Sequence, residues 1–156
     1  MKTVFSALQL AHAPTRFLSK GHIVDYPESP DRARALLEGA REAGTQICAT
    51  RKLLDDGVLS RIHDPAYLNF LKLGFRRWQE IDDSAPEMMV SLRAMRPPLF
   101  ESNHLMAEAG RYLGDFSCAI TEHTWRSVEA SATTAITAAD MLLRGEKSVY
   151  ALCRPP

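Results

Sequence analysis

The chain has 156 residues, of which 46% are hydrophobic, and its 19 lysines and arginines balance 19 aspartates and glutamates. This length can bury one ordinary core, so a single domain is the simplest organisation. Without net charge there is no global field to attract nucleic acid or an anionic membrane. No apolar run approaches the ~20 residues of a membrane span. The apolar run at the N-terminus is too short for a signal peptide, so a cytoplasmic protein is expected.

The N-terminal third predicts a strand, an irregular stretch and a helix. Residues 2–5 are a short β-prone run, and residues 7–28 show little periodicity. Ser29 and Pro30 are typical of a helix start, because serine accepts from free N–H groups and proline suits the first helical position. Gly44 is the natural terminator. The expected apolar face of this helix holds Leu36, Leu37 and Ala40.

The middle of the chain predicts a weak strand at 46–49 and a helical turn at 56–62. Asp64 and Pro65 repeat the cap-and-proline pattern before an amphipathic helix with Leu68, Leu71, Phe75 and Trp78 at helical spacing. From 81 to 102 prolines interrupt the pattern, and a long loop of this kind is usually functional. Residues 104–114 can form a short helix.

The C-terminal third predicts a long helix followed by a strand. Thr124 is expected to cap a helix over 125–144 that ends at Gly145, and residues 148–152 are apolar enough for a parallel sheet. Strand, crossover helix and strand indicate an α/β fold. One broad apolar face of the helix holds Val128, Ala132, Ala135, Ile136, Ala139, Leu142 and Leu143.

Residue chemistry alone identifies no reaction. The five histidines lack the spacing of a metal motif, the aspartate pairs fall in turn-like sequence, and the glycines are too scattered for a phosphate loop. Three unpaired cysteines, Cys48, Cys118 and Cys153, are expected to be small buried hydrophobes.

Four segments in series change this interpretation: residues 28–32 (ESPDR), 62–71 (IHDPAYLNFL), 124–125 (TW) and 150–156 (YALCRPP). Together they resemble the N-terminal half of the histone deacetylase and acetylpolyamine amidohydrolase superfamily, and most closely its bacterial acetylpolyamine subset. The resemblance implies an arginase-like, three-layer α/β fold with a mainly parallel sheet. This chain would supply about the first three strands, as the N-terminal part of a single incomplete domain over 1–156.

The resemblance also implies a reaction. In this superfamily a zinc ion, held by two aspartates and a histidine, activates water to attack an N-acetyl carbonyl, assisted by tandem histidines and a tyrosine. The family continues after Arg-Pro-Pro with Gly-His-His, whereas Pro156 is the last residue here. No catalytic residue or metal ligand is therefore expected in this chain, which should be inactive alone and bind no zinc by itself.

Several positions receive roles from the resemblance. Arg32 matches an arginine beside a channel for departing acetate, although a helix-surface role is equally open. Arg154, Pro155 and Pro156 form the approach to the active site. Loops 12–28 and 80–115 correspond to its rim, whose substrate-facing candidates are Phe17, Gly21, His22, Met106 and Ser117.

The rim departs from the polyamine-cleaving members. They place acids at positions 17, 106 and 117, where this chain has Phe17, Met106 and Ser117. Without these acids a cationic polyamine loses much of its attraction, unless Glu101 or Glu108 compensates. An apolar rim, extended by Phe100, suits a less cationic acylated amine.

Two functional hypotheses follow. The first is a zinc-dependent deacetylase or amidohydrolase that acts on N-acyl amides of lysine or polyamine-like amines, with its catalytic half outside this chain. The alternative is a non-catalytic interaction or dimerisation module. The expected partners are an acylated amine substrate in the complete enzyme, and either further copies of the chain or the missing C-terminal half.

Overall fold

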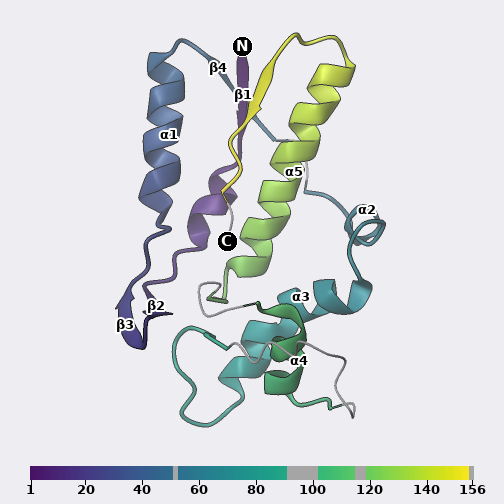
Figure 1. Cartoon of the computed structure of the whole chain (residues 1–156). Helices are drawn as coiled ribbons and strands as arrows, with labels where there is room; N and C mark the ends of the chain where they lie inside the picture. Colours follow the sequence, from purple (N-terminus) through teal and green to yellow (C-terminus); the bar gives the residue numbers. More distant parts are fainter. Residues whose placement is uncertain (51–52, 91–101, 115–118, 155–156) are drawn as a thin grey trace. The chain divides into compact units, whose positions relative to one another are not determined.

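The computed structural model describes residues 1–50, 53–90, 102–114 and 119–154 (Figure 1). These residues fall into two compact units. Unit 1 comprises Met1–Ala13, Glu28–Val58 and His123–Pro156, and unit 2 comprises Pro14–Pro27 and Leu59–Glu122. Within the described ranges, no helix is long and apolar enough to cross a membrane.

Unit 1 is built on a parallel three-stranded sheet, which confirms the three predicted strands. Strand β1 (Lys2–Phe5) lies between β4 (Gln46–Ala49) and β5 (Val149–Ala151). The central residue Val4 is opposite Cys48 on one side and Ala151 on the other, and it is fully buried. Helices α1 (Pro30–Glu42) and α5 (Thr124–Leu143) flank the sheet on opposite sides (Figure 1).

Helix α1 begins and ends where its sequence predicts. The Ser29 hydroxyl accepts a hydrogen bond from the Asp31 N–H at 3.2 Å, Pro30 follows the cap, and Gly44 adopts a left-handed φ of 68° just beyond the helix. The predicted apolar face is only partly correct, because Ala40 is buried whereas Leu36 is exposed. Ala33 is the other buried position of the helix.

Helix α5 buries a different face from the apolar one. Its buried residues are mainly small or hydroxyl-bearing: Thr124, Ser127, Ala130, Thr133, Thr134, Thr137 and Ala138. Small side chains let the helix approach β1, β5 and the 3-10 helix η1 (Ala7–Ala11) closely, and threonine hydroxyls can be satisfied within the helix. The Thr134 and Thr137 hydroxyls donate to carbonyls one turn earlier at 2.8 and 2.7 Å.

The outer side of α5 is correspondingly apolar. Leu142 and Leu143, which belong to the predicted apolar face, are 46% and 86% exposed. The predicted cap is also wrong, since His123 occupies the cap position and Thr124 is the first helical residue. The buried Thr124 hydroxyl instead shares a 2.9 Å hydrogen bond with His12 Nδ1, a contact between segments far apart in sequence.

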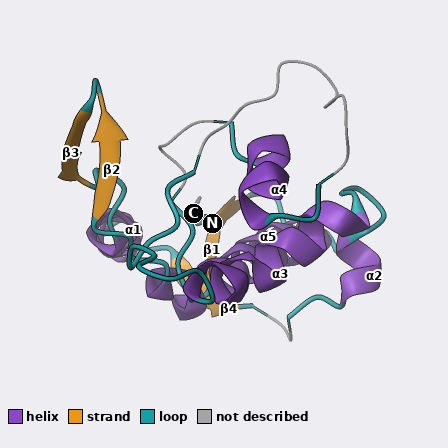
Figure 2. Ribbon diagram, turned by 90° about the horizontal axis from the view of Figure 1, so that it is seen from below, coloured by secondary structure: helices purple, strands orange, loops and turns teal. Residues whose placement is uncertain are grey.

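Unit 2 contains a β-hairpin in the stretch predicted to be irregular. Strands β2 (Arg16–Ser19) and β3 (His22–Asp25) pair in antiparallel register, side by side in Figure 2. Lys20 and Gly21, at the turn, have φ values of 50° and 82°, as a type I′ turn requires. The turn was not predicted because Lys20 stands where asparagine or aspartate is usual in such turns.

The rest of unit 2 packs helices α3 (Pro65–Gln79) and α4 (Leu105–Tyr112) around a core of Phe70, Met88 and Ala109. The Asp64 carboxylate caps α3 as predicted, accepting from the Ala66 N–H at 2.8 Å. The short helix α2 (Asp56–Leu59) lies where the two units join in sequence.

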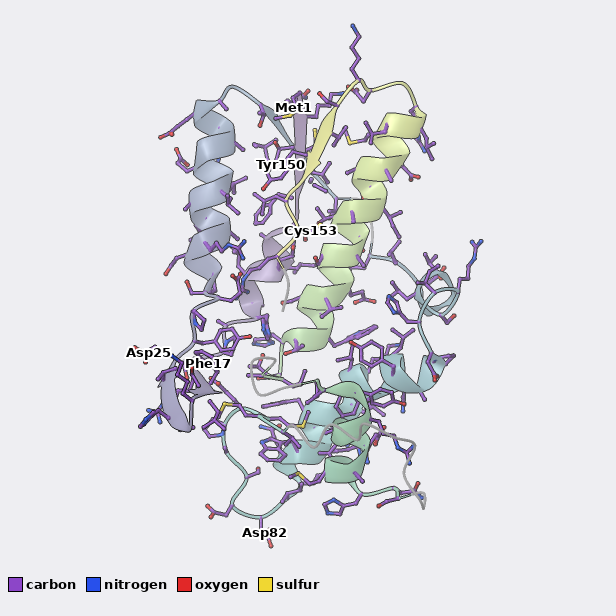
Figure 3. All side chains as sticks on the ribbon, in the orientation of Figure 1. Met1, Phe17, Asp25, Asp82, Tyr150 and Cys153 are labelled. Carbon is purple, nitrogen blue, oxygen red and sulfur yellow. The ribbon has the colours of Figure 1, made fainter. Side chains whose placement is uncertain are left out.

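The cysteine prediction is partly wrong. Cys153 is exposed and Cys48 is half-buried, while Cys118 lies outside the described residues. Cys153 follows the short strand β5 and is labelled in Figure 3.

Candidate functional site at the end of strand β5

The end of β5 is where unit 1 concentrates its buried polar side chains. Ligands of open parallel sheets bind beyond the carboxyl ends of the strands, so this is the expected location of a site. Strand β1 ends at Phe5, and the last bond of the ladder runs from the Leu152 N–H to the Val4 carbonyl at 3.0 Å. Beyond that point the Leu152 carbonyl and the Arg154 N–H need hydrogen-bond partners other than β1.

The side chain of Gln9, from η1, supplies that partner. Its Oε1 accepts from the Arg154 N–H at 2.6 Å, and its Nε2 donates to the Leu152 carbonyl at 3.1 Å. These are the groups that a neighbouring strand would bind, so the buried amide extends the ladder past the end of β1. Nε2 also lies 3.2 Å from the Thr134 hydroxyl and thereby ties the strand end to α5.

Arg154 is buried and forms the centre of the network, with only 2% of its side chain exposed. Nη1 donates to the backbone carbonyls of Gln9, at 3.0 Å, and of His12. Its other contacts are with Glu28, through Nε to the carboxylate at 3.2 Å and Nη2 to the carbonyl at 2.9 Å. A buried guanidinium is tolerated here because a carboxylate and three carbonyls accept its protons.

Arg32 lies on the outer side of the same carboxylate. Its Nη1 is 2.7 Å from Glu28 Oε2, and 61% of its side chain is exposed. This hydrogen bond and the negative charge of Glu28 raise the pKa of the Arg32 guanidinium above its ordinary value. Two arginines therefore share one carboxylate, which leaves one net positive charge at the end of β5.

A small cavity adjoins these charges. Its volume of about 20 Å³ is close to the space that a single water molecule needs. The acetate-channel role of Arg32 stays a prediction. The lining residues are Glu28, Arg32, Ala33, Leu36, Leu152, Cys153 and Arg154.

The rim candidates that are described belong to unit 2. Phe17, Gly21 and His22 lie together on the β2–β3 hairpin, where the Phe17 ring packs edge-on against Tyr26 with centroids 5.8 Å apart. Met106 lies on a separate element, in the first turn of α4, and is half-buried. Ser117, Pro155, Pro156, Phe100 and Glu101 lie outside the described residues.

A larger cavity of about 350 Å³ lies beside the hairpin, between Thr15, Arg16, Ile23 and the segment 85–89. Glu87 joins the two walls, because its carboxylate accepts from the Thr15 N–H at 2.5 Å and the Arg16 N–H at 3.2 Å. No sequence pattern indicates this contact, which joins residues more than seventy positions apart.

Of the two acids that could compensate for the missing rim charges, Glu101 lies outside the described residues and Glu108 is already engaged. Glu108 forms an ion pair with Arg77, which also donates to the Asn103 carbonyl at 3.1 Å. Its negative charge is therefore neutralised within unit 2, and it has less to offer a cationic ligand.

No zinc site is formed by the described residues. Across the described ranges, no group of three or more histidine, cysteine, aspartate or glutamate side chains could hold a metal ion. The zinc implied by the resemblance thus has no ligand set in the described part of this chain.

Fold and sequence together define the class. The chain belongs to the histone deacetylase domain family, which matches residues 26–156. The homology is to proteins of the deacetylase and amidohydrolase kind, and the resemblance in the sequence motifs is confirmed.

Particular relatives match over the whole chain. The acetylpolyamine amidohydrolase of Burkholderia pseudomallei is 35% identical over 159 residues, and that of Mycoplana ramosa is 30% identical. The chain spans about 45% and 46% of their lengths.

Solved structures agree. The crystal structure of acetylpolyamine aminohydrolase from Burkholderia pseudomallei superposes with a TM-score of 0.90 at 33% identity, covering the whole chain and 45% of that protein. The HDA15 HD domain, at 17% identity and a TM-score of 0.62, shares the fold and is covered over 36% of its length.

Proposed function

We propose that this chain forms part of a hydrolase that cleaves an N-acyl amide, releasing an amine and a carboxylate. The observation that carries the proposal is the similarity to an acetylpolyamine aminohydrolase over the whole chain, with a TM-score of 0.90. Its contribution would be the first strands of the sheet and the buried support at the end of β5. The catalytic groups would come from outside the described residues.

We further propose a substrate that is less cationic than a polyamine, such as an acylated lysine. By the family resemblance, Phe17 and Met106 stand where polyamine-cleaving members have acids, and Glu108 is paired with Arg77. Each missing carboxylate lowers the attraction for an extended cation. In an active enzyme, Phe17→Glu should raise kcat/KM for an acetylated polyamine relative to acetyl-lysine. Ile23→Glu is the control and should not, because Ile23 is 55% exposed and is adjacent to Val24, the cross-strand partner of Phe17, so that it belongs to the other face of the hairpin.

Zinc is proposed for the complete protein only. The 156-residue chain, incubated with zinc and acetyl-lysine, should show no turnover and no stoichiometric metal. One equivalent of tightly bound zinc together with hydrolysis would contradict the proposal that the ligands lie elsewhere. The nucleotide sequence after the codon for Pro156 gives an independent test. A Gly-His-His segment, in frame or after a shift or stop, supports the hydrolase, and the lack of any homologous segment argues against it.

The second candidate function is a non-catalytic interaction or dimerisation module. It is favoured by the apolar outer side of α5, where Leu142 and Leu143 are exposed. Exposed apolar surface of this kind is typical of a site that binds another polypeptide. A stable homodimer of the chain without any catalytic counterpart would favour this function over the hydrolase.

A further inference from the structure

The β2–β3 hairpin of unit 2 has little packing to hold it in place. All four residues of β3 are exposed, and the cavity of about 350 Å³ lies against the hairpin face that carries Arg16 and Ile23. These two residues share a face because Leu18, two positions after Arg16, is the cross-strand partner of Ile23, whereas Phe17 belongs to the opposite face. Burial therefore fixes the hairpin weakly, and its position depends on directional hydrogen bonds.

Three of these hydrogen bonds converge on Glu87. Its Oε1 accepts from the Thr15 N–H at 2.5 Å and from the Thr15 hydroxyl at 2.8 Å, and its Oε2 accepts from the Arg16 N–H at 3.2 Å. Hydrogen bonds to a carboxylate are roughly twice as strong as neutral ones. Both backbone donors come immediately before Phe17, so Glu87 fixes the direction in which the chain enters β2.

The segment that carries Glu87 is itself anchored on both sides. The Ala85 carbonyl accepts from Trp78 Nε1 at 2.7 Å. Met88 is fully buried and exchanges two backbone hydrogen bonds with Ile120, at 2.9 and 3.0 Å. Glu87 is therefore a fixed point within unit 2, against which the exposed hairpin is held.

On the hairpin side, Thr15 connects Glu87 to the ring of Phe17. The Thr15 carbonyl accepts from the Tyr26 N–H at 2.9 Å, which closes the base of the hairpin. The Tyr26 ring in turn packs edge-on against Phe17, with centroids 5.8 Å apart. The backbone before Phe17 and the ring beside it thus both depend on a residue that Glu87 holds.

We propose that Glu87 is a positioning residue for the acylated amine, because it holds the hairpin in the orientation in which Phe17 contacts the substrate. The inference rests on the function proposed above, in which Phe17 belongs to the substrate rim. Glu87 directs its carboxylate to the hairpin backbone and acts on the substrate only through Phe17. Its removal should weaken substrate binding and leave the chemical step unchanged.

The first test measures hydrogen exchange in the 156-residue chain. Glu87→Gln replaces one acceptor oxygen with an amide group that only donates, and Glu87→Ala removes all three hydrogen bonds. The control is Glu80→Gln, the same chemical change in an exposed ion pair with Arg76 at 3.9 Å. Exchange in the peptide 15–26 should accelerate by roughly tenfold or more in Glu87→Ala, less in Glu87→Gln and not in the control. Unchanged exchange in α3 shows that each variant is folded.

The second test measures kinetics in an active enzyme that contains this chain. Glu87→Ala should raise KM for acetyl-lysine by roughly tenfold, the factor that an apolar contact of about 1.4 kcal/mol supports, with kcat almost unchanged. In a Phe17→Ala background the same substitution should raise KM much less, because the side chain that it positions is already absent. A general loss of stability would not depend on Phe17 in this way.

The inference is overturned by any of three results. These are unchanged exchange in the peptide 15–26, a fall in kcat without a rise in KM, and an effect of Glu87→Ala that is equally large without the Phe17 ring. An enzyme that hydrolyses no acylated amine contradicts the proposed function instead. In that case the exchange measurement still decides whether Glu87 holds the hairpin.

Discussion

Replacing Gln9 by leucine tests whether its amide completes the sheet. Leucine keeps the approximate size of the side chain and removes both ladder bonds, so the Arg154 N–H and the Leu152 carbonyl lose their partners in a buried place. The Thr134 hydroxyl also loses a contact but still donates to the Ala130 carbonyl. The loss of stability therefore comes from two buried backbone groups that have no hydrogen-bond partner in the variant.

The magnitude follows from that count. A buried donor or acceptor left without a partner costs about 1–3 kcal/mol, so two cost about 2–6 kcal/mol before the apolar leucine recovers part of the loss. A net decrease of about 2–4 kcal/mol in the free energy of unfolding is expected. At a urea slope of about 1–3 kcal/mol per molar, the midpoint should fall by about 0.7–4 M.

The assay is urea unfolding followed by circular dichroism, with Gln46→Leu as the matched control. Gln46 is an exposed glutamine on β4, so its replacement should change stability by less than about 0.5 kcal/mol. Loss of amide protection in the peptide 148–154, measured by hydrogen exchange, should accompany the Gln9 variant alone. A Gln9→Leu chain as stable as the original would refute the role assigned to this amide.

Three further outcomes are expected. Gly21→Ala should cost about 1 kcal/mol in thermal unfolding, because Gly21 has a φ of 82°, whereas Gly39→Ala inside α1 meets no neighbouring atom and should stabilise by up to about 1 kcal/mol. Equal shifts for the two variants would contradict this. Glu28→Ala should cost about 3–5 kcal/mol, since it leaves the buried Arg154 guanidinium without its carboxylate, and an unchanged melting temperature would count against the network. Cys153 is exposed as a residue, but partial desolvation of its thiol raises the pKa of that group. Its alkylation rate should therefore rise at higher pH than that of a free cysteine, and a profile shifted to lower pH would exclude desolvation as the dominant influence.

The helices and parallel strands were predictable because their signals are local. Ser29 and Asp64 cap helices in the structure as their sequence context indicates, and the strand at 46–49 has the predicted bounds. A cap depends on residues within one turn, and a buried parallel strand needs only a short apolar run. Such features can be read without knowing the tertiary neighbours.

The polar network at the end of β5 could not be predicted, because it depends on contacts across the whole chain. Gln9 and Arg154 are 145 positions apart, and Gln9 lies in a stretch without periodicity. No local rule marks a glutamine in a 3-10 helix as a substitute for a strand. Arg32, the arginine singled out from the sequence, is the exposed member of the pair that shares Glu28.

The burial of α5 was misassigned for a different reason. Helical periodicity identifies an apolar face but does not tell which neighbour covers it. Here the close packing inside unit 1 selects the threonine and alanine face, since small residues allow the shortest approach to the sheet. The leucines are left for another surface.

These two features have complementary physical consequences. The network around Arg154 fixes the strand end by directional bonds, which fail if one partner is removed, and so determines where the chain leaves the sheet. The flank of α5 offers non-directional apolar area, which tolerates variation but is stable only when covered. In unit 1 the directional hydrogen bonds therefore lie inside, around the end of β5, whereas the exposed leucines lie on the outer side of α5.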